Sequence, residues 1–136
     1  MSISKLYSDH FTYEELQCPL SKEIECQPGF IFELEKLRKE YAKPMLVTSC
    51  CRSEARNKMI GGHPKSLHMM ENPFYQVGGK PLQTCAIDIQ RPDGVSLYRL
   101  IAIAVQNSWT VGVSDTFIHL DMRSRFLEMP PRIYTY

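Results

Sequence analysis

Two long helical patterns set among short strand-like runs most limit how this chain of 136 residues can fold. Residues 28–43 and 94–108 place apolar side chains three or four positions apart, the spacing of one helix face. Short apolar runs that predict strands lie at 44–50, 85–89, 109–113 and 117–123. Helices segregated from a small, mostly antiparallel sheet imply an α+β fold.

Polar residues at the expected helix ends support these assignments. Thr12 lies in a short helical segment at 11–16 and has Glu15 in the spacing of a capping box. Ser53 is expected to cap a helix over 53–60. The buried stripes of the two long helices are predicted to be Ile31, Leu34, Leu37, Tyr41, Leu97, Leu100, Ile101 and Ala104.

Composition narrows the class of protein. The length suits one domain over residues 1–136, and 43% hydrophobic with 23% charged residues is ordinary for a globular chain. A net charge of +1 argues against nucleic-acid binding through bulk basicity. No apolar run is long enough to insert into a membrane. The first 16 residues lack the apolar core of a secretory signal, so we expect synthesis in the cytoplasm without a signal peptide.

The five cysteines cannot all pair within one chain, because their number is odd. No pair of CxxC words supports a zinc ribbon. We therefore expect mostly reduced, partly buried thiols that pack as small hydrophobic groups. A bridge between Cys18 and Cys26 is the main alternative.

Three residues at the edges of predicted strands could bind one metal ion. His68, Asp88 and His119 supply two imidazoles and one carboxylate, the ligand set of a catalytic zinc site with a fourth position for water. Zinc lowers the pKa of such a water and polarises a carbonyl oxygen. Asp121 follows His119 by two positions, so both side chains leave the same face of a strand. Each residue alone would also suit a purely structural role.

Five short sequence motifs resemble those of one family and occur in the same order along the chain. "HFTYEELQCP", "LVTSCCRSEARN", "GGHPKSLH", "CAIDI" and "FIHLDMR" are similar to the opening helix, the "SGYRS…N" segment and the three ligand segments of the zinc D-Ala-D-Ala carboxypeptidase and L-alanyl-D-glutamate endopeptidase family. These hedgehog-type zinc peptidases cut the peptide stems of bacterial cell wall. The resemblance extends over residues 10–123 and implies a hedgehog/DD-peptidase-like fold.

The resemblance assigns roles to individual residues. It implies zinc ligands at His68, Asp88 and His119, and it places Asp121 at the aspartate of the family's HxD word. Arg52 and Ser53 take the Arg-Ser positions, where the arginine faces a substrate carboxylate, and Ser66 takes the serine before the first ligand. We therefore expect catalytic roles for Asp121 and Arg52, with Arg52, Ser53 and Ser66 binding substrate.

Two departures from the family pattern stand out. The first histidine and the aspartate are twenty residues apart instead of about seven, as though the segment at 69–84 contained an insertion. Closing such a loop costs little, roughly 0.6 kcal/mol per doubling of length. We expect a mobile flap or hairpin at the cleft, with Phe74 and Tyr75 available to contact substrate; a surface excursion without a role is the alternative. In addition, Cys50 and Cys51 replace a glycine and an aromatic residue.

Three other polar residues compete for the same roles. His63 lies five positions before His68 and is a rival ligand, although its glycine-rich loop favours exposure or substrate contact. His10 is expected to be structural or exposed. Asp115 is a rival for the catalytic acid or base, although a turn residue is the simpler interpretation.

Together these expectations describe a zinc-dependent peptidoglycan peptidase that acts on stem peptides, by preference an L-Ala–D-Glu endopeptidase. A D,D-carboxypeptidase of the same family and a non-catalytic zinc-containing binding module are the alternatives. We expect a monomer that reaches the periplasm or wall through a holin-like pore or lysis.

Overall fold

The structure, a computed structural model, describes residues 5–136 and is built around a five-stranded sheet in the order β1-β4-β6-β5-β7. The strands are β1 (Val47–Ser49), β4 (Ala86–Gln90), β6 (Phe117–Asp121), β5 (Thr110–Val113) and β7 (Ile133–Thr135). Neighbouring strands are antiparallel except β5 and β7, which are parallel. This arrangement confirms the predicted α+β fold with a mostly antiparallel sheet. Residues 1–4, which begin the N-terminal segment that lacks the apolar core of a secretory signal, lie outside the described residues.

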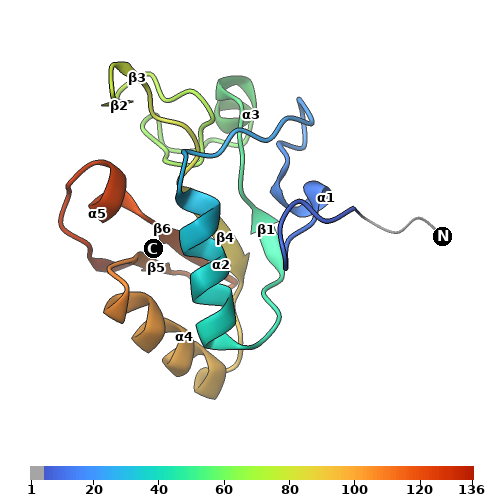
Figure 1. Ribbon diagram of the computed structural model, residues 1–136, viewed down its shortest axis with the longest axis vertical. Helices are drawn as coiled ribbons and strands as arrows, with labels where there is room; N and C mark the ends of the chain where they lie inside the picture. Colours follow the sequence, from blue (N-terminus) through green and yellow to red (C-terminus); the bar gives the residue numbers. More distant parts are fainter. Residues whose placement is uncertain (1–4) are drawn as a thin grey trace.

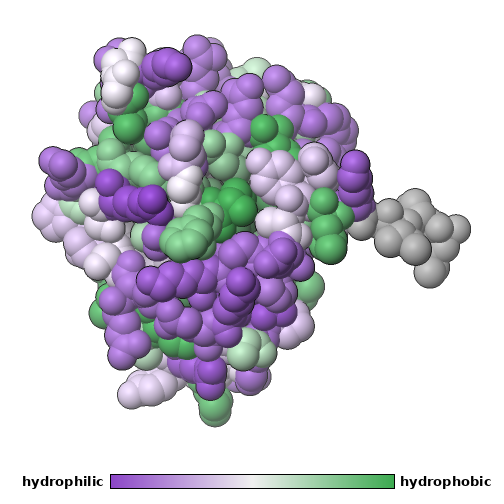
Figure 2. Space-filling view, in the orientation of Figure 1, coloured by the Kyte–Doolittle hydropathy of each residue, from purple (hydrophilic) through white to green (hydrophobic). Residues whose placement is uncertain are grey.

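The described residues also form five helices: α1 (Tyr13–Leu16), α2 (Phe30–Tyr41), α3 (Glu54–Met59), α4 (Gly94–Gln106) and α5 (Arg123–Phe126). Figure 1 shows α2 crossing in front of the sheet, with α4 beside its lower end and α3 at the opposite end of the molecule. Figure 2 shows a broad hydrophilic area over the lower part of α2. None of the helices in the described part of the chain is long and apolar enough to cross a membrane.

The helix ends follow the sequence signals. The Thr12 hydroxyl accepts a hydrogen bond from the Glu15 amide at 3.1 Å, and the Glu15 carboxylate accepts one from the Thr12 amide at 2.9 Å. The predicted capping box is therefore present. The Ser53 hydroxyl accepts a hydrogen bond from the Arg56 amide at 3.1 Å and so caps α3. Helix α2 begins at Phe30, because Gly29 turns the chain with a φ of 94°.

The core lies between the sheet and the two long helices. Both predicted apolar stripes face it: Ile31 and Ile101 are partly buried, and the buried members are Leu34, Leu37, Tyr41, Leu97, Leu100 and Ala104. The sheet contributes Ile87, Ile89, Val111, Ile118 and Leu120. Close packing on this scale fixes the positions of β4 and β6, which carry the site described below.

Within the segment 69–84, residues 76–81 form a β-hairpin, and residues near both ends of the segment are buried. Strands β2 (Gln76–Val77) and β3 (Lys80–Pro81) pair across Gly78 and Gly79, whose positive φ angles of 60° and 78° suit a two-residue hairpin turn. Met69 and Leu82 are buried at the two ends of the segment. The segment expected to form a flap or hairpin therefore has a hairpin turn at Gly78 and Gly79, with Met69 and Leu82 buried on either side of it.

Hydrogen exchange should distinguish the hairpin turn from the buried residues on either side of it. We expect the amides of Gly78 and Gly79 to exchange much faster than those of α4, because both glycines are exposed in the turn. The amide of Leu82, which donates to the Tyr75 carbonyl at 2.9 Å, should exchange slowly. Exchange at the turn as slow as in α4 would contradict a mobile flap.

All five cysteines are free, as expected. Cys18 and Cys26 are not joined. The Cys18 thiol instead contacts the Ser53 hydroxyl at 3.7 Å, and the Cys26 sulfur lies 3.8 Å from that of Cys51.

Candidate metal centre

The sheet brings two of the three predicted ligands side by side. Asp88 and His119 are directly opposite each other in the antiparallel pair formed by β4 and β6. Side chains at opposite positions share a face of the sheet and are close enough to touch. His68, in the loop before the hairpin, completes the group, and one ligand atom from each residue lies within 4.8 Å of the others.

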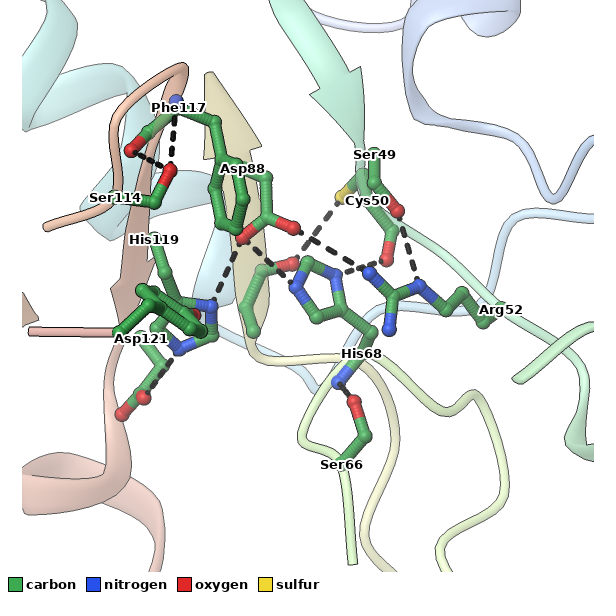
Figure 3. Close-up of polar contacts among 12 residues, drawn as sticks. Ser49, Cys50, Arg52, Ser66, His68, Asp88, Ser114, Phe117, His119 and Asp121 are labelled. Carbon is green, nitrogen blue, oxygen red and sulfur yellow. Dashed lines mark hydrogen bonds and ion pairs between the residues drawn. The ribbon is translucent and has the colours of Figure 1, made fainter. Parts of the chain in front are cut away.

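The Asp88 carboxylate lies between the two imidazoles. Its Oδ1 is 3.1 Å from Nε2 of His68 and 2.9 Å from Nδ1 of His119 (Figure 3). Ligands about 2.0–2.1 Å from a tetrahedral zinc ion are separated from one another by roughly 3.3 Å. The donor types fit zinc, and the two separations from Asp88 Oδ1 are close to those in such a site.

The nitrogen of each imidazole that does not face Asp88 has a polar partner of its own. Nδ1 of His68 donates to the carbonyl oxygen of Cys50 at 2.8 Å. Nε2 of His119 lies 2.8 Å from Oδ2 of Asp121. Such contacts fix the ring orientation and turn the other nitrogen of each ring toward Asp88, an arrangement that histidine ligands of metal sites also have.

Asp121 is fully buried and has both oxygens occupied. Besides contacting His119, it accepts hydrogen bonds from Nε and Nη2 of Arg123 at 3.0 and 2.8 Å and from the Arg123 amide at 3.0 Å. Although burial acts in the opposite direction, the hydrogen bonds from His119 and Arg123 lower the pKa of Asp121 to about 2. The carboxylate thus holds His119 and is itself fixed by Arg123.

Arg52 lies on the other side of Asp88. Its Nη2 is 3.3 Å from Oδ2 of Asp88, its Nε donates to the Ser49 hydroxyl at 3.0 Å, and its Nη1 donates to the Asn57 amide oxygen at 3.2 Å. The family resemblance implies that this guanidinium faces a substrate carboxylate. The structure adds that it contacts the carboxylate of a candidate ligand.

The charges of the three candidate ligands are strongly coupled. Burial lowers the pKa of His68. In Asp88, burial acts the other way, but the charge of His68 and the hydrogen bond with His119 lower the pKa well below its usual range. In His119, burial is outweighed by hydrogen bonds with Asp121 and Asp88, which raise its pKa to about 9. Asp88 therefore stays ionised between the two imidazoles, and a metal ion bound there would replace the proton that His119 retains.

A cavity of about 510 Å³ opens beside this group. Ser66 and His63 line it; the Ser66 hydroxyl accepts a hydrogen bond from the His68 amide at 3.2 Å, and exposed His63 is outside the three-residue cluster. Tyr75 of the hairpin segment also lines the cavity, whereas Phe74 is 54% exposed and is not part of the lining.

Other predicted residues lie away from the cavity. The Ser53 hydroxyl caps α3 and does not line the cavity. His10 contacts the Glu35 carboxylate, as expected for a structural residue. Asp115 is exposed in the turn between β5 and β6. The structure therefore places neither His10 nor Asp115 at the candidate metal centre.

The sequence analysis did not predict that residues between 123 and 136 form one wall of the cavity. Arg123, Met129, Arg132, Tyr134 and Tyr136 all line the cavity. Gly112 permits this arrangement, because a Cβ atom there would lie 2.7 Å from Cζ of Tyr134. The alternating aromatics of "IYTY" were the available signal, but the run is too short to show which strand it would join.

Comparison with known proteins agrees with this geometry. The family model described as Peptidase M15 matches residues 9–121. The chain belongs to the peptidase M15 family. Among curated proteins and solved structures, none matches the chain. The matched region of this M15 chain includes all three candidate ligands, Arg52 and Asp121, whereas the wall from Arg123 to Tyr136 lies beyond it.

Proposed function

We propose that this M15 peptidase is a zinc enzyme that cleaves the stem peptides of bacterial peptidoglycan, by preference between L-Ala and D-Glu. The observation that carries the proposal is the convergence of His68, Asp88 and His119 at the wall of an open cavity. The choice of bond rests on resemblance to small, single-domain endopeptidases. The proposed substrate implies action in the periplasm or cell wall.

The chain's own residues prepare this site for peptide hydrolysis. When bound, zinc would polarise the scissile carbonyl group and make a water more acidic. Cys50 and Asp121 fix the two imidazoles, and Arg52 holds the second oxygen of Asp88. The site therefore has its ligands oriented before substrate arrives, which reduces the reorganisation needed during the reaction.

The charge of the cavity suits an acidic peptide. Arg52 and Arg123 already contact Asp88 and Asp121, which are the two carboxylates among the described lining residues. Lys65 and Arg132 also line the cavity, and among the described residues neither forms an ion pair. Stem peptides carry free carboxylates that these two cations could bind through charge-assisted hydrogen bonds.

Digestion of purified peptidoglycan tests the proposal directly. The zinc-loaded protein should release fragments with a new amino-terminal D-Glu, identified by mass spectrometry, and a chelator should abolish their release. Release of D-Ala instead would identify a D,D-carboxypeptidase. Binding to peptidoglycan without any new termini would identify a non-catalytic module.

Arg52→Ala should raise KM or lower kcat/KM on stem peptides while zinc stays bound, because a substrate carboxylate loses its partner. Arg56→Ala is the matched control, since it removes the same charge outside the cavity lining. Enzyme kinetics and elemental analysis of the same preparations separate binding of substrate from binding of metal. Unchanged kinetics would remove Arg52 from the site, whereas loss of zinc would show that it acts through Asp88.

A further inference from the structure

A second cluster of potential metal ligands lies behind His68. The sulfur atoms of Cys26, Cys50 and Cys51 all lie within 4.8 Å of one another. Cys50 and Cys51 are almost completely buried, with exposed fractions of 1% and 0%, whereas Cys26 is partly exposed. The cluster is therefore shielded from bulk solvent on most sides and accessible through Cys26.

The local backbone explains how two consecutive cysteines reach the same point. Successive side chains in a regular strand point to opposite faces. Strand β1 ends at Ser49, after an irregular register between Val47 and Ser49, so Cys50 and Cys51 follow the strand rather than belong to it. The Cys51 amide donates to the Leu16 carbonyl at 3.1 Å instead of continuing the ladder. This break lets both thiols approach Cys26.

The spacing and chemistry of the three sulfurs suit a soft metal ion. The sulfurs of Cys26 and Cys51 are 3.8 Å apart. Thiolates bound to zinc at about 2.3 Å in tetrahedral geometry are separated by about 3.8 Å. The sulfurs of Cys26 and Cys51 are in hydrogen-bond contact. Contacts with Cys26 and Cys50 lower the pKa of Cys51, which favours the thiolate form that binds metals, whereas contacts within the cluster raise the pKa values of Cys26 and Cys50.

We propose that Cys26, Cys50 and Cys51 form a second metal site, distinct from the His68–Asp88–His119 group, for a thiophilic d10 ion such as Zn(II) or Cu(I). Thiolate ligands select ions of this class over hard cations. Coordination is by thiolates, so Cys26 and Cys50, which carry protons in the metal-free protein, each release one proton as their metal–sulfur bonds form, whereas Cys51 binds as the thiolate already present.

The position of the cluster links it to the candidate catalytic site. The carbonyl oxygen of Cys50 accepts the hydrogen bond from Nδ1 of His68 at 2.8 Å (Figure 3). Thr84 forms an isolated β-bridge with Cys26, and its hydroxyl donates a hydrogen bond to the His68 carbonyl at 2.8 Å. A metal ion at the thiols would tie together the two segments that hold His68, so it should stabilise the folded protein.

Titration of the reduced, chelator-treated full chain with Cd(II) under anaerobic conditions tests the second site. We expect two ions per chain, one of them with sulfur-to-cadmium charge-transfer absorption in the ultraviolet and an increase in Tm. Cys51→Ser should lose this absorption and one bound ion. Cys26→Ser should do the same, and because Cys26 is partly exposed this variant guards against a folding defect. His119→Ala should lose the other ion and retain the absorption.

Cys18→Ser is the matched control, since it removes a buried thiol outside the cluster and should leave the charge-transfer band intact. Elemental analysis before chelator treatment distinguishes the two ions of the class: copper that is lost in Cys51→Ser indicates a site for Cu(I), and zinc that is lost in that variant indicates a site for Zn(II). Absence of the band in the wild-type protein, or its survival in both cluster variants, would overturn the proposal. A Cys26–Cys51 disulfide in protein whose thiols were blocked at lysis would also overturn it.

Discussion

His119→Ala should lose the zinc ion of the His68–Asp88–His119 group and with it measurable peptidase activity. The substitution removes Nδ1, which lies 2.9 Å from Oδ1 of Asp88 in the centre of the candidate ligand group. With two ligands remaining, a four-coordinate zinc site with three protein ligands cannot form. Elemental analysis of the purified variant, together with digestion of peptidoglycan, measures both losses.

His63→Ala is the control for this prediction. His63 also lines the cavity, but it is exposed, and its Nδ1 accepts a hydrogen bond from the Lys65 amide at 3.0 Å rather than facing Asp88. This variant should retain zinc at wild-type stoichiometry. As much zinc in His119→Ala as in the wild-type protein, or loss of zinc in His63→Ala, would show that the ligands are assigned wrongly.

The parts of the fold that were predictable are those whose signals are local. The capping residues Thr12 and Ser53 act within three residues of their partners, and the stripes of α2 and α4 arise from helical periodicity. Strands β4 and β6 are short apolar runs, and their pairing places Asp88 opposite His119. The ligand group therefore follows from local patterns together with the family resemblance.

The parts that were missed depend on contacts between distant residues. Arg52 reaches Asp88 across 36 positions, and nothing near Arg52 in the sequence indicates that contact. Strand β7 has three residues and is defined by its parallel pairing with β5. Because strand formation depends on neighbouring strands more than on intrinsic preference, the sequence could not place Tyr134 in the cavity wall.

Asp121→Ala should weaken zinc binding roughly ten- to a hundredfold and reduce activity with it, as expected for a residue that orients a ligand. The contacts of Asp121 favour this role over that of general base. Its side chain is fully buried, one oxygen contacts His119, and both accept hydrogen bonds from Arg123. A general base must also reach the proton that it abstracts.

Measurements of zinc affinity and of kcat at saturating zinc separate the two roles of Asp121. If the residue positions His119, excess zinc should restore much of the activity, because the remaining defect is in binding of the metal. If it is the base, a loss of about a hundredfold or more in kcat should persist when zinc is saturating.

Asp121→Asn preserves the shape of the buried side chain and guards against misfolding. Asp115→Ala, in the exposed turn, is the control and should be nearly silent. Loss of turnover in Asp115→Ala with unchanged zinc binding and turnover in Asp121→Ala would transfer the catalytic role to Asp115.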